Sequence, residues 1–217
     1  MRGYGGYTSE HGRVLIAPIL KEQPNTKLIT VFFGTNDVNT VTPGRFVSIE
    51  RYEENIRYIV DYCTKSDLKV IVIGPTIVDE LEDPENLARD TLLKLKYAQT
   101  AEKVAKEFNV GYLDLYHAFL HAVGWKEGEP LPGKRGVESK HSSKLSTLLT
   151  DGTHFTGQGY RVFHDELVST IAKYYPELQP ENVYRKFPLA GDIDPGNIRK
   201  SLGLEFSTST NTQSEQI

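Results

Sequence analysis

Three short apolar runs, separated by long segments of helical periodicity, constrain the fold of this chain more than any other feature. The runs cover residues 28–33, 70–73 and 110–115. The first two are almost continuously apolar, as expected for parallel strands that are covered on both faces. The third run, Val-Gly-Tyr-Leu-Asp-Leu, is more mixed, but its place after a helical segment predicts a third strand.

The intervening segments carry apolar residues at spacings of three and four, which predicts amphipathic helices. Thr156 is expected to cap the last of them. An earlier helix over residues 9–20 is expected to kink or restart at Pro18. The alternation predicts an α/β domain with a parallel sheet, whose ligands bind beyond the carboxyl ends of the strands. The stripe residues are Tyr52, Ile56, Ile59 and Cys63 for residues 50–65; Leu87, Leu95, Ala98, Ala101, Ala105 and Phe108 for the second helix; and Tyr160, Phe163, Leu167, Ile171 and Tyr174 for the last.

Length and composition exclude several classes of protein. The 217 residues suit one domain, expected over residues 1–200, with a polar and disordered tail over 201–217. A net charge of −4 argues against a nucleic-acid partner, and no apolar run is long enough to span a membrane. Cys63 is the only cysteine, which favours a reducing, cytoplasmic compartment, and its place on a helical stripe predicts a buried hydrophobe rather than a nucleophile. A homodimer is left open.

The first motif whose residues could take part in a reaction is the tetrapeptide Gly-Thr-Asn-Asp at residues 34–37, directly after the first strand. Gly34 allows the backbone to turn sharply at the strand end. Asn36 can then project a neutral amide donor that stabilises a developing oxyanion. The alternative is that Asn36 and Asp37 only build a turn and cap the next helix.

The second motif is Asp-Gly-Thr-His at residues 151–154, just before the last helix. His154 has a side chain suited to proton transfer near neutral pH. Asp151 can accept from one ring nitrogen and leave the other to act as a general base. The alternative is a turn-forming aspartate beside an ordinary loop histidine.

A glycine-rich loop at residues 2–9 (Arg-Gly-Tyr-Gly-Gly-Tyr-Thr-Ser) opens onto the first helix. Its spacing differs from that of a phosphate-binding loop, so a phosphate cradle is a poor interpretation. One of its N–H groups could instead serve as an oxyanion donor.

Taken together, these segments resemble the SGNH (GDSL) hydrolase family, and within it the group of esterases that hydrolyse isoamyl acetate. The similarity is also carried by Val-Ile-Gly-Pro at residues 72–75 and Phe-His-Asp-Glu-Leu at residues 163–167. The resemblance implies a three-layer α/β/α sandwich with a flavodoxin-like sheet. It also implies hydrolysis of small acyl esters through an acyl-enzyme, with no metal or other cofactor. The residues implied are His154 as base, Asp151 as its orienting carboxylate, and Gly6 and Asn36 as oxyanion donors.

One block of the family pattern is absent from residues 1–217. The family's nucleophile lies in a Gly-Asp-Ser triplet upstream of the glycine-rich loop, and no such triplet occurs in this chain. We therefore expect the chain to lack the first strand and the nucleophile. Ser9, Ser142, Ser143 and Ser146 are weak substitutes, Ser9 because a capping role explains it and the others because they lie in a polar stretch expected to be mobile.

Three functions remain open from the sequence. The first is an ester hydrolase whose N-terminal segment is missing from these residues. The second is a non-catalytic pseudoenzyme that binds esters or a protein partner. The third, a flavodoxin-like nucleotide binder, rests on fold alone and has no phosphate-binding loop to support it.

Overall fold

The three apolar runs form one parallel sheet in the computed structural model, which describes residues 3–82, 89–183 and 187–204. The strands are β1 (Leu28–Phe32), β2 (Lys69–Ile73) and β3 (Gly111–Leu113), in the order β1-β2-β3. Leu28 lies opposite Lys69 across the first pair, and Ile71 lies opposite Gly111 across the second. The parallel α/β sheet expected from the periodicity is therefore confirmed.

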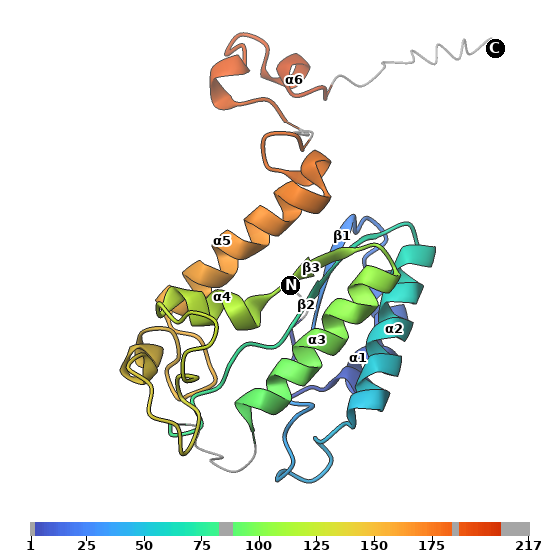
Figure 1. The fold of residues 1–217 in the computed structure, drawn as a ribbon. Coiled ribbons are helices and arrows are strands. Elements are labelled where there is room, and N and C mark those ends of the chain that lie inside the picture. Colours follow the sequence, from blue (N-terminus) through green and yellow to red (C-terminus); the bar gives the residue numbers. More distant parts are fainter. Residues whose placement is uncertain (1–2, 83–88, 184–186, 205–217) are drawn as a thin grey trace, which may run out of the picture. The chain divides into compact units, whose positions relative to one another are not determined.

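Helices cover both faces of this sheet (Figure 1). On one face α1 (Ser9–Glu22), α2 (Ile49–Lys65) and α3 (Thr91–Glu107) form one buried cluster with alternate residues of the strands, among them Val31 and Val72. On the other face α4 (Leu115–Ala122) and α5 (Gly157–Tyr174) form a second cluster with Ile71 and Ile73. The alternation of side chains along each strand thus divides the core into two layers, which gives the expected α/β/α sandwich.

Side-chain caps define where the main helices begin. The hydroxyl of Ser48 accepts from the N–H of Arg51 at the start of α2, and Asp90 accepts from Leu93 at the start of α3. The predicted cap of α5 is confirmed, because Thr156 Oγ1 accepts from the N–H of Gly159 at 3.1 Å. Leu87, which was expected on the stripe of the second helix, lies outside the described residues.

The expected end of the third strand was wrong. The third strand ends at Leu113, because Asp114 caps a new helix by accepting from the N–H of His117, and Leu115 becomes its first residue. The first helix does not restart at Pro18 but continues to Glu22. The proline ring removes a hydrogen bond to the carbonyl of Val14, a residue exposed enough for water to replace that bond.

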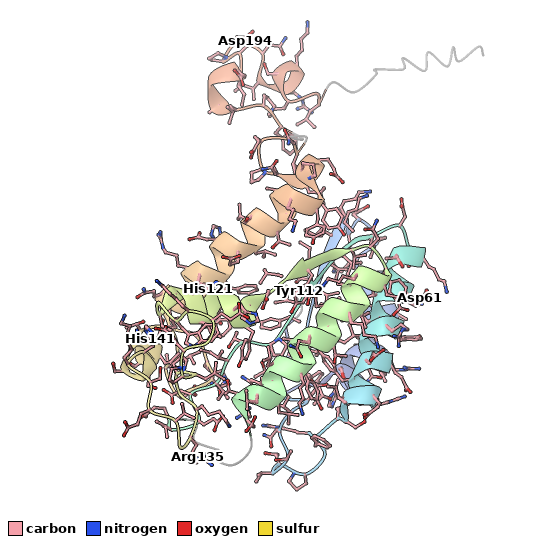
Figure 2. The ribbon with its side chains drawn as sticks, in the orientation of Figure 1. Asp61, Tyr112, His121, Arg135, His141 and Asp194 are labelled. Carbon is pink, nitrogen blue, oxygen red and sulfur yellow. The ribbon has the colours of Figure 1, made fainter. Side chains whose placement is uncertain are left out.

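The segment between α4 and α5 has little regular structure beyond the 3₁₀ turn η1 (Ser142–Thr147), yet it is held by specific contacts. Figure 2 shows Arg135 and His141 on this segment. The N–H of Arg135 donates to the buried carboxylate of Glu80 at 3.1 Å. The ring of His141 is within hydrogen-bond distance of Glu129 and of the carbonyl of Val123. These contacts hold the segment against Glu80 and against the carboxyl end of α4.

Residues 180–217 form a second, smaller unit, separate from residues 1–179. Its described part contains the 3₁₀ turn η3 (Ala190–Asp192) and the short helix α6 (Ile198–Ser201), while the first unit ends with the turn η2 (Pro176–Leu178). Most of the tail expected to be disordered lies outside the described residues. Among the helices described, none is long and apolar enough to cross a membrane.

Candidate active site

Asp151 and His154 form a tight pair on the loop before α5. Nδ1 of His154 lies 2.8 Å from Oδ2 of Asp151. The other carboxylate oxygen, Oδ1, accepts the backbone N–H groups of Thr153 at 3.1 Å and of His154 at 2.8 Å. The aspartate therefore builds the turn and orients the ring with the same side chain.

The electrostatics of Asp151 favour its ionised form. Partial burial by itself would raise its pKa, but the hydrogen bonds from the backbone and ring of His154 and from Thr153 outweigh that cost. The pKa of Asp151 falls from its ordinary 3.8 to about 2. A carboxylate with this pKa stays charged near neutral pH and can stabilise an imidazolium beside it.

This pair makes a prediction for the pH dependence of stability. Because the pKa of Asp151 is lowered in the folded state, its ionised form stabilises the fold above about pH 4, and that stabilisation is lost as the pH falls toward 2. The side chain is 39% exposed. We therefore expect at most about 1 kcal/mol. Urea unfolding of wild type and Asp151→Asn should differ more at pH 5 than at pH 2, and a difference that does not change with pH would contradict this assignment.

The same motif occurs a second time in the chain. At Asp114-x-x-His117, Nδ1 of His117 lies 2.7 Å from Oδ2 of Asp114, and the N–H of His117 donates to Oδ1. The Asp-x-x-His geometry alone is therefore not evidence of catalysis. What distinguishes His154 is its surroundings, since it lines a pocket with the oxyanion candidates.

Asn36 lies just beyond the carboxyl end of β1. Gly34, at the turn between them, has φ of +111°, and a Cβ there would lie 2.8 Å from the ring of Pro75, so the position requires glycine. This contact also explains the Val-Ile-Gly-Pro block, whose proline packs against the turn. Nδ2 of Asn36 donates to the carbonyl of Tyr7 at 3.0 Å. An amide nitrogen carries two hydrogens, so one remains for a ligand.

Asp37 connects the two loops of the site, a role that the sequence analysis did not find. Its fully buried carboxylate accepts the N–H of Gly34 at 3.0 Å and the N–H of Ser9 at 2.9 Å. Burial raises the pKa of Asp37, against the effect of these hydrogen bonds. Because Ser9 follows the glycine-rich loop, one carboxylate holds that loop and the Asn36 turn together. The expected turn is present, because one carboxylate oxygen accepts from Gly34, but the other oxygen accepts from Ser9, which is distant in sequence.

Gly6 lies in the turn of residues 4–7, closed by a hydrogen bond from the N–H of Tyr7 to the carbonyl of Tyr4. Its φ of +78° falls in the left-handed region, which side chains with a Cβ rarely adopt. The aromatic rings of Tyr4 and Tyr7 stack with centroids 5.1 Å apart. The residues at the two ends of the turn thus pack their rings against each other.

A pocket of about 280 Å³ brings three of the four predicted site residues together. Gly6, Asn36 and His154 all line the pocket, and Asp151 is hydrogen-bonded to the histidine ring. Two further lining residues were not singled out for the site from the sequence. Arg89 donates through Nε to the carbonyl of Thr35 at 3.2 Å, and Tyr160, expected on a core stripe, is instead 60% exposed beside the pocket. No motif marks Arg89, because its neighbours in sequence carry no pattern.

The serines and the cysteine are poorly suited to be a nucleophile in this pocket. Cys63 is fully buried, and burial raises the pKa of its thiol to about 12. Ser9 is also buried and is the first residue of α1 rather than its cap, which is Thr8. None of the pocket-lining residues is a serine or a cysteine. The remaining candidates, Ser142, Ser143 and Ser146, belong to the turn η1 rather than to a mobile stretch.

The described residues contain no group of three or more histidine, cysteine, aspartate or glutamate side chains placed to hold a metal ion. The pocket itself offers an imidazole beside a carboxylate, together with neutral hydrogen-bond donors. These groups match the needs of acyl transfer, apart from the attacking atom.

Comparison with known proteins points to ester hydrolases. Residues 1–162 match the model of the GDSL-like lipase/acylhydrolase family. The isoamyl acetate-hydrolyzing esterase of Saccharomyces cerevisiae is 32% identical over 209 residues, covering 91% of this chain and 79% of that protein. The esterase of the same name from Schizosaccharomyces pombe is 27% identical, covering 88% of this chain and 69% of that protein.

Solved structures support the fold. A lipase/acylhydrolase from Enterococcus faecalis superposes with a TM-score of 0.57 at 24% identity, covering 79% of this chain and 74% of that one. An acetylxylan esterase from Geobacillus stearothermophilus superposes with a TM-score of 0.58 at 17% identity, covering 76% and 68%.

Proposed function

This chain belongs to the GDSL-like lipase/acylhydrolase family, and on that premise we propose that it carries the base and the oxyanion donors of an esterase for small acyl esters. The observation that supports this most directly is the shared pocket of Gly6, Asn36 and His154, with Asp151 hydrogen-bonded to the ring. The yeast relative, whose name gives isoamyl acetate as its substrate, suggests an acetyl ester of a short alcohol.

In the proposed reaction, His154 removes a proton from an attacking hydroxyl as that oxygen adds to the ester carbonyl carbon. The carbonyl oxygen becomes an oxyanion, which accepts from the amide of Asn36 and the N–H of Gly6. The imidazolium, stabilised by Asp151, then protonates the leaving alcohol. A water molecule activated by the same base finally releases the acid and restores the hydroxyl.

The attacking hydroxyl of this scheme is not assigned to any residue of 1–217. We propose that it belongs to a serine on polypeptide outside these residues, in the Gly-Asp-Ser triplet that the family pattern places upstream. The ring of His154 supports this proposal, because its side chain is 79% exposed in the described structure. A base intended to act on a neighbouring hydroxyl should be partly covered by the segment that carries it.

The test compares two proteins in the hydrolysis of a short acyl ester such as 4-nitrophenyl acetate. One is the chain of residues 1–217, and the other, called the extended chain below, adds the in-frame sequence encoded upstream. We expect saturable hydrolysis only in the extended chain. Residues 1–217 should give at most weak water-mediated activity, because polarising groups alone leave a small residual rate.

Two other results of this assay would contradict the proposed arrangement. Activity of residues 1–217 that depends on His154 would reveal a nucleophile within this chain and contradict the proposed arrangement. A folded chain that binds ester without hydrolysing it, together with an upstream sequence that lacks Gly-Asp-Ser, would support the pseudoenzyme instead.

A further inference from the structure

The turn that carries Asn36 is held by hydrogen bonds to three successive carbonyl groups. The carbonyls of Gly34 and Asn36 each accept a backbone N–H from shortly after them in the chain, at 3.2 and 3.0 Å. The carbonyl of Thr35 lies between these two and accepts from a side chain instead, since Nε of Arg89 donates to it at 3.2 Å. One of the three contacts therefore depends on the identity of a residue that is far away in the sequence.

The Thr35 carbonyl matters because it belongs to the peptide group that precedes Asn36. A peptide group is planar, so the carbonyl oxygen of Thr35 and the backbone nitrogen of Asn36 turn together. A donor that holds this oxygen thus limits rotation of the backbone at Asn36 and, with it, the direction of the side chain. Nδ2 of Asn36 also donates to the carbonyl of Tyr7. The residue is therefore restrained both through its backbone and through its side chain.

Arg89 is placed by the start of α3. Asp90, the next residue, caps that helix, and its Oδ2 also pairs with Nζ of Lys134 at 3.0 Å. The backbone N–H of Thr91 donates to the buried carboxylate of Glu80 at 2.9 Å. Because the residues that follow Arg89 are fixed in this way, its guanidinium reaches the pocket from a well-held backbone.

The guanidinium lines the same pocket as Asn36 and His154. Among the described residues that line this pocket, Arg89 is the one whose side chain carries a permanent charge. Two roles are therefore open to it, which are positioning of Asn36 through the Thr35 carbonyl and direct attraction of a negative charge in the substrate. The hydrogen bond from Nε favours the first role, because it ties the side chain to the turn.

We propose that Arg89 is a positioning residue, which holds the Thr35–Asn36 peptide so that the Asn36 amide points at the developing oxyanion. It acts through Thr35 and forms no bond to the reacting atoms. The role rests on the proposed function, in which Asn36 is an oxyanion donor. Since that donor acts in the transition state, a poorly aligned amide should lower kcat and leave KM nearly unchanged.

The test uses two substitutions of similar length in the extended chain, assayed with 4-nitrophenyl acetate. In Arg89→Gln, Nε2 takes the place of the arginine Nε and keeps a donor for the Thr35 carbonyl, while the charge is lost. In Arg89→Met, a methyl group takes that place and the donor is lost as well. We expect kcat to fall about 10- to 100-fold in Arg89→Met and at most about threefold in Arg89→Gln, with KM within about twofold in both.

Arg57→Met is the matched control. The guanidinium of Arg57 donates to Glu107 and so ties α2 to α3, but Arg57 does not line the pocket. This variant should leave kcat within about twofold. Equal losses in Arg89→Gln and Arg89→Met would mean that the charge acts rather than the hydrogen bond, and would overturn the proposal. An unchanged kcat in both would also overturn it, as would a rise in KM alone, which would place Arg89 in substrate binding.

A second readout requires no hydrolysis. The side-chain amide of Asn36 gives a pair of signals in a proton–nitrogen NMR spectrum of the extended chain without substrate. These signals should keep their wild-type positions in Arg89→Gln and shift or broaden in Arg89→Met, while urea unfolding checks that both variants are folded. Unshifted signals in Arg89→Met would overturn the proposal. Shifted signals in a chain whose wild type hydrolyses no ester would support the positioning of Asn36 and count against the proposed function.

Discussion

Replacing His154 with alanine in the extended chain is expected to lower kcat for a short acyl ester by about 10⁴- to 10⁶-fold, with little change in KM. The reason is that His154 accepts a proton twice in the proposed reaction. It accepts one from the attacking hydroxyl in the first half and one from the water molecule in the second half. The ring is hydrogen-bonded to Asp151 and its side chain is largely exposed, so its removal should cost the fold little.

The chain provides its own control for this experiment. His117 has the same spacing from its aspartate and nearly the same Nδ1–Oδ2 distance, 2.7 Å against 2.8 Å, but it does not line the pocket. His117→Ala should therefore leave kcat within about twofold, since ordinary surface substitutions have small effects. Equal losses in both variants would mean that the Asp-x-x-His pairs are structural. No loss in His154→Ala would remove this residue as the base.

Replacing Gly159 with alanine should destabilise the protein by about 1–3 kcal/mol, whereas the same change at Gly157 should not. A Cβ on Gly159 would lie 2.3 Å from the carbonyl oxygen of Leu148, a backbone atom that cannot move alone. That oxygen also accepts the N–H of Thr156, so the clash reaches the cap of α5 and the loop that holds His154. Gly157, two residues earlier in the same helix, has no atom within 4 Å of its added Cβ.

Urea unfolding followed by circular dichroism measures both variants under the same conditions. Gly157→Ala should be neutral or raise the free energy of unfolding by up to about 1 kcal/mol, because alanine loses less conformational entropy than glycine on folding. If Gly159→Ala unfolds at the same urea concentration as wild type, the close approach of α5 to residue 148 is not as the structure has it. Where folding is retained, Gly159→Ala in the extended chain should also lower kcat for a short acyl ester, because the clash displaces the loop that holds His154.

The elements that could be predicted from sequence are those whose signals are local. The apolar runs and the stripes at spacings of three and four are properties of neighbouring residues, and β1, β2, α2 and α5 lie within one or two residues of their expected bounds. The cap at Thr156 is equally local. The helix α4 was missed because its eight residues are mostly apolar, with four of them buried, so they show no clear polar face.

Residues of the site were predictable to the extent that they lie in short motifs. Asp151 and His154 are three residues apart, and their contact follows from a single turn. Arg89 reaches the pocket from a region without a motif, 54 residues along the chain from the Thr35 carbonyl that it contacts. Asp37 looked like a turn residue because its second partner, Ser9, lies 28 residues away in the sequence.

The sequence by itself therefore determined the alternation of strands and helices, the pairing of His154 with Asp151, and the absence of a Gly-Asp-Ser triplet, since each depends on residues close together in the chain. Only the tertiary structure decided which of two identical Asp-x-x-His pairs shares a pocket with Asn36 and Gly6. It alone brought Arg89 to the carbonyl of Thr35. Both depend on the packing of helices against a sheet, which brings distant segments together and which no local pattern encodes.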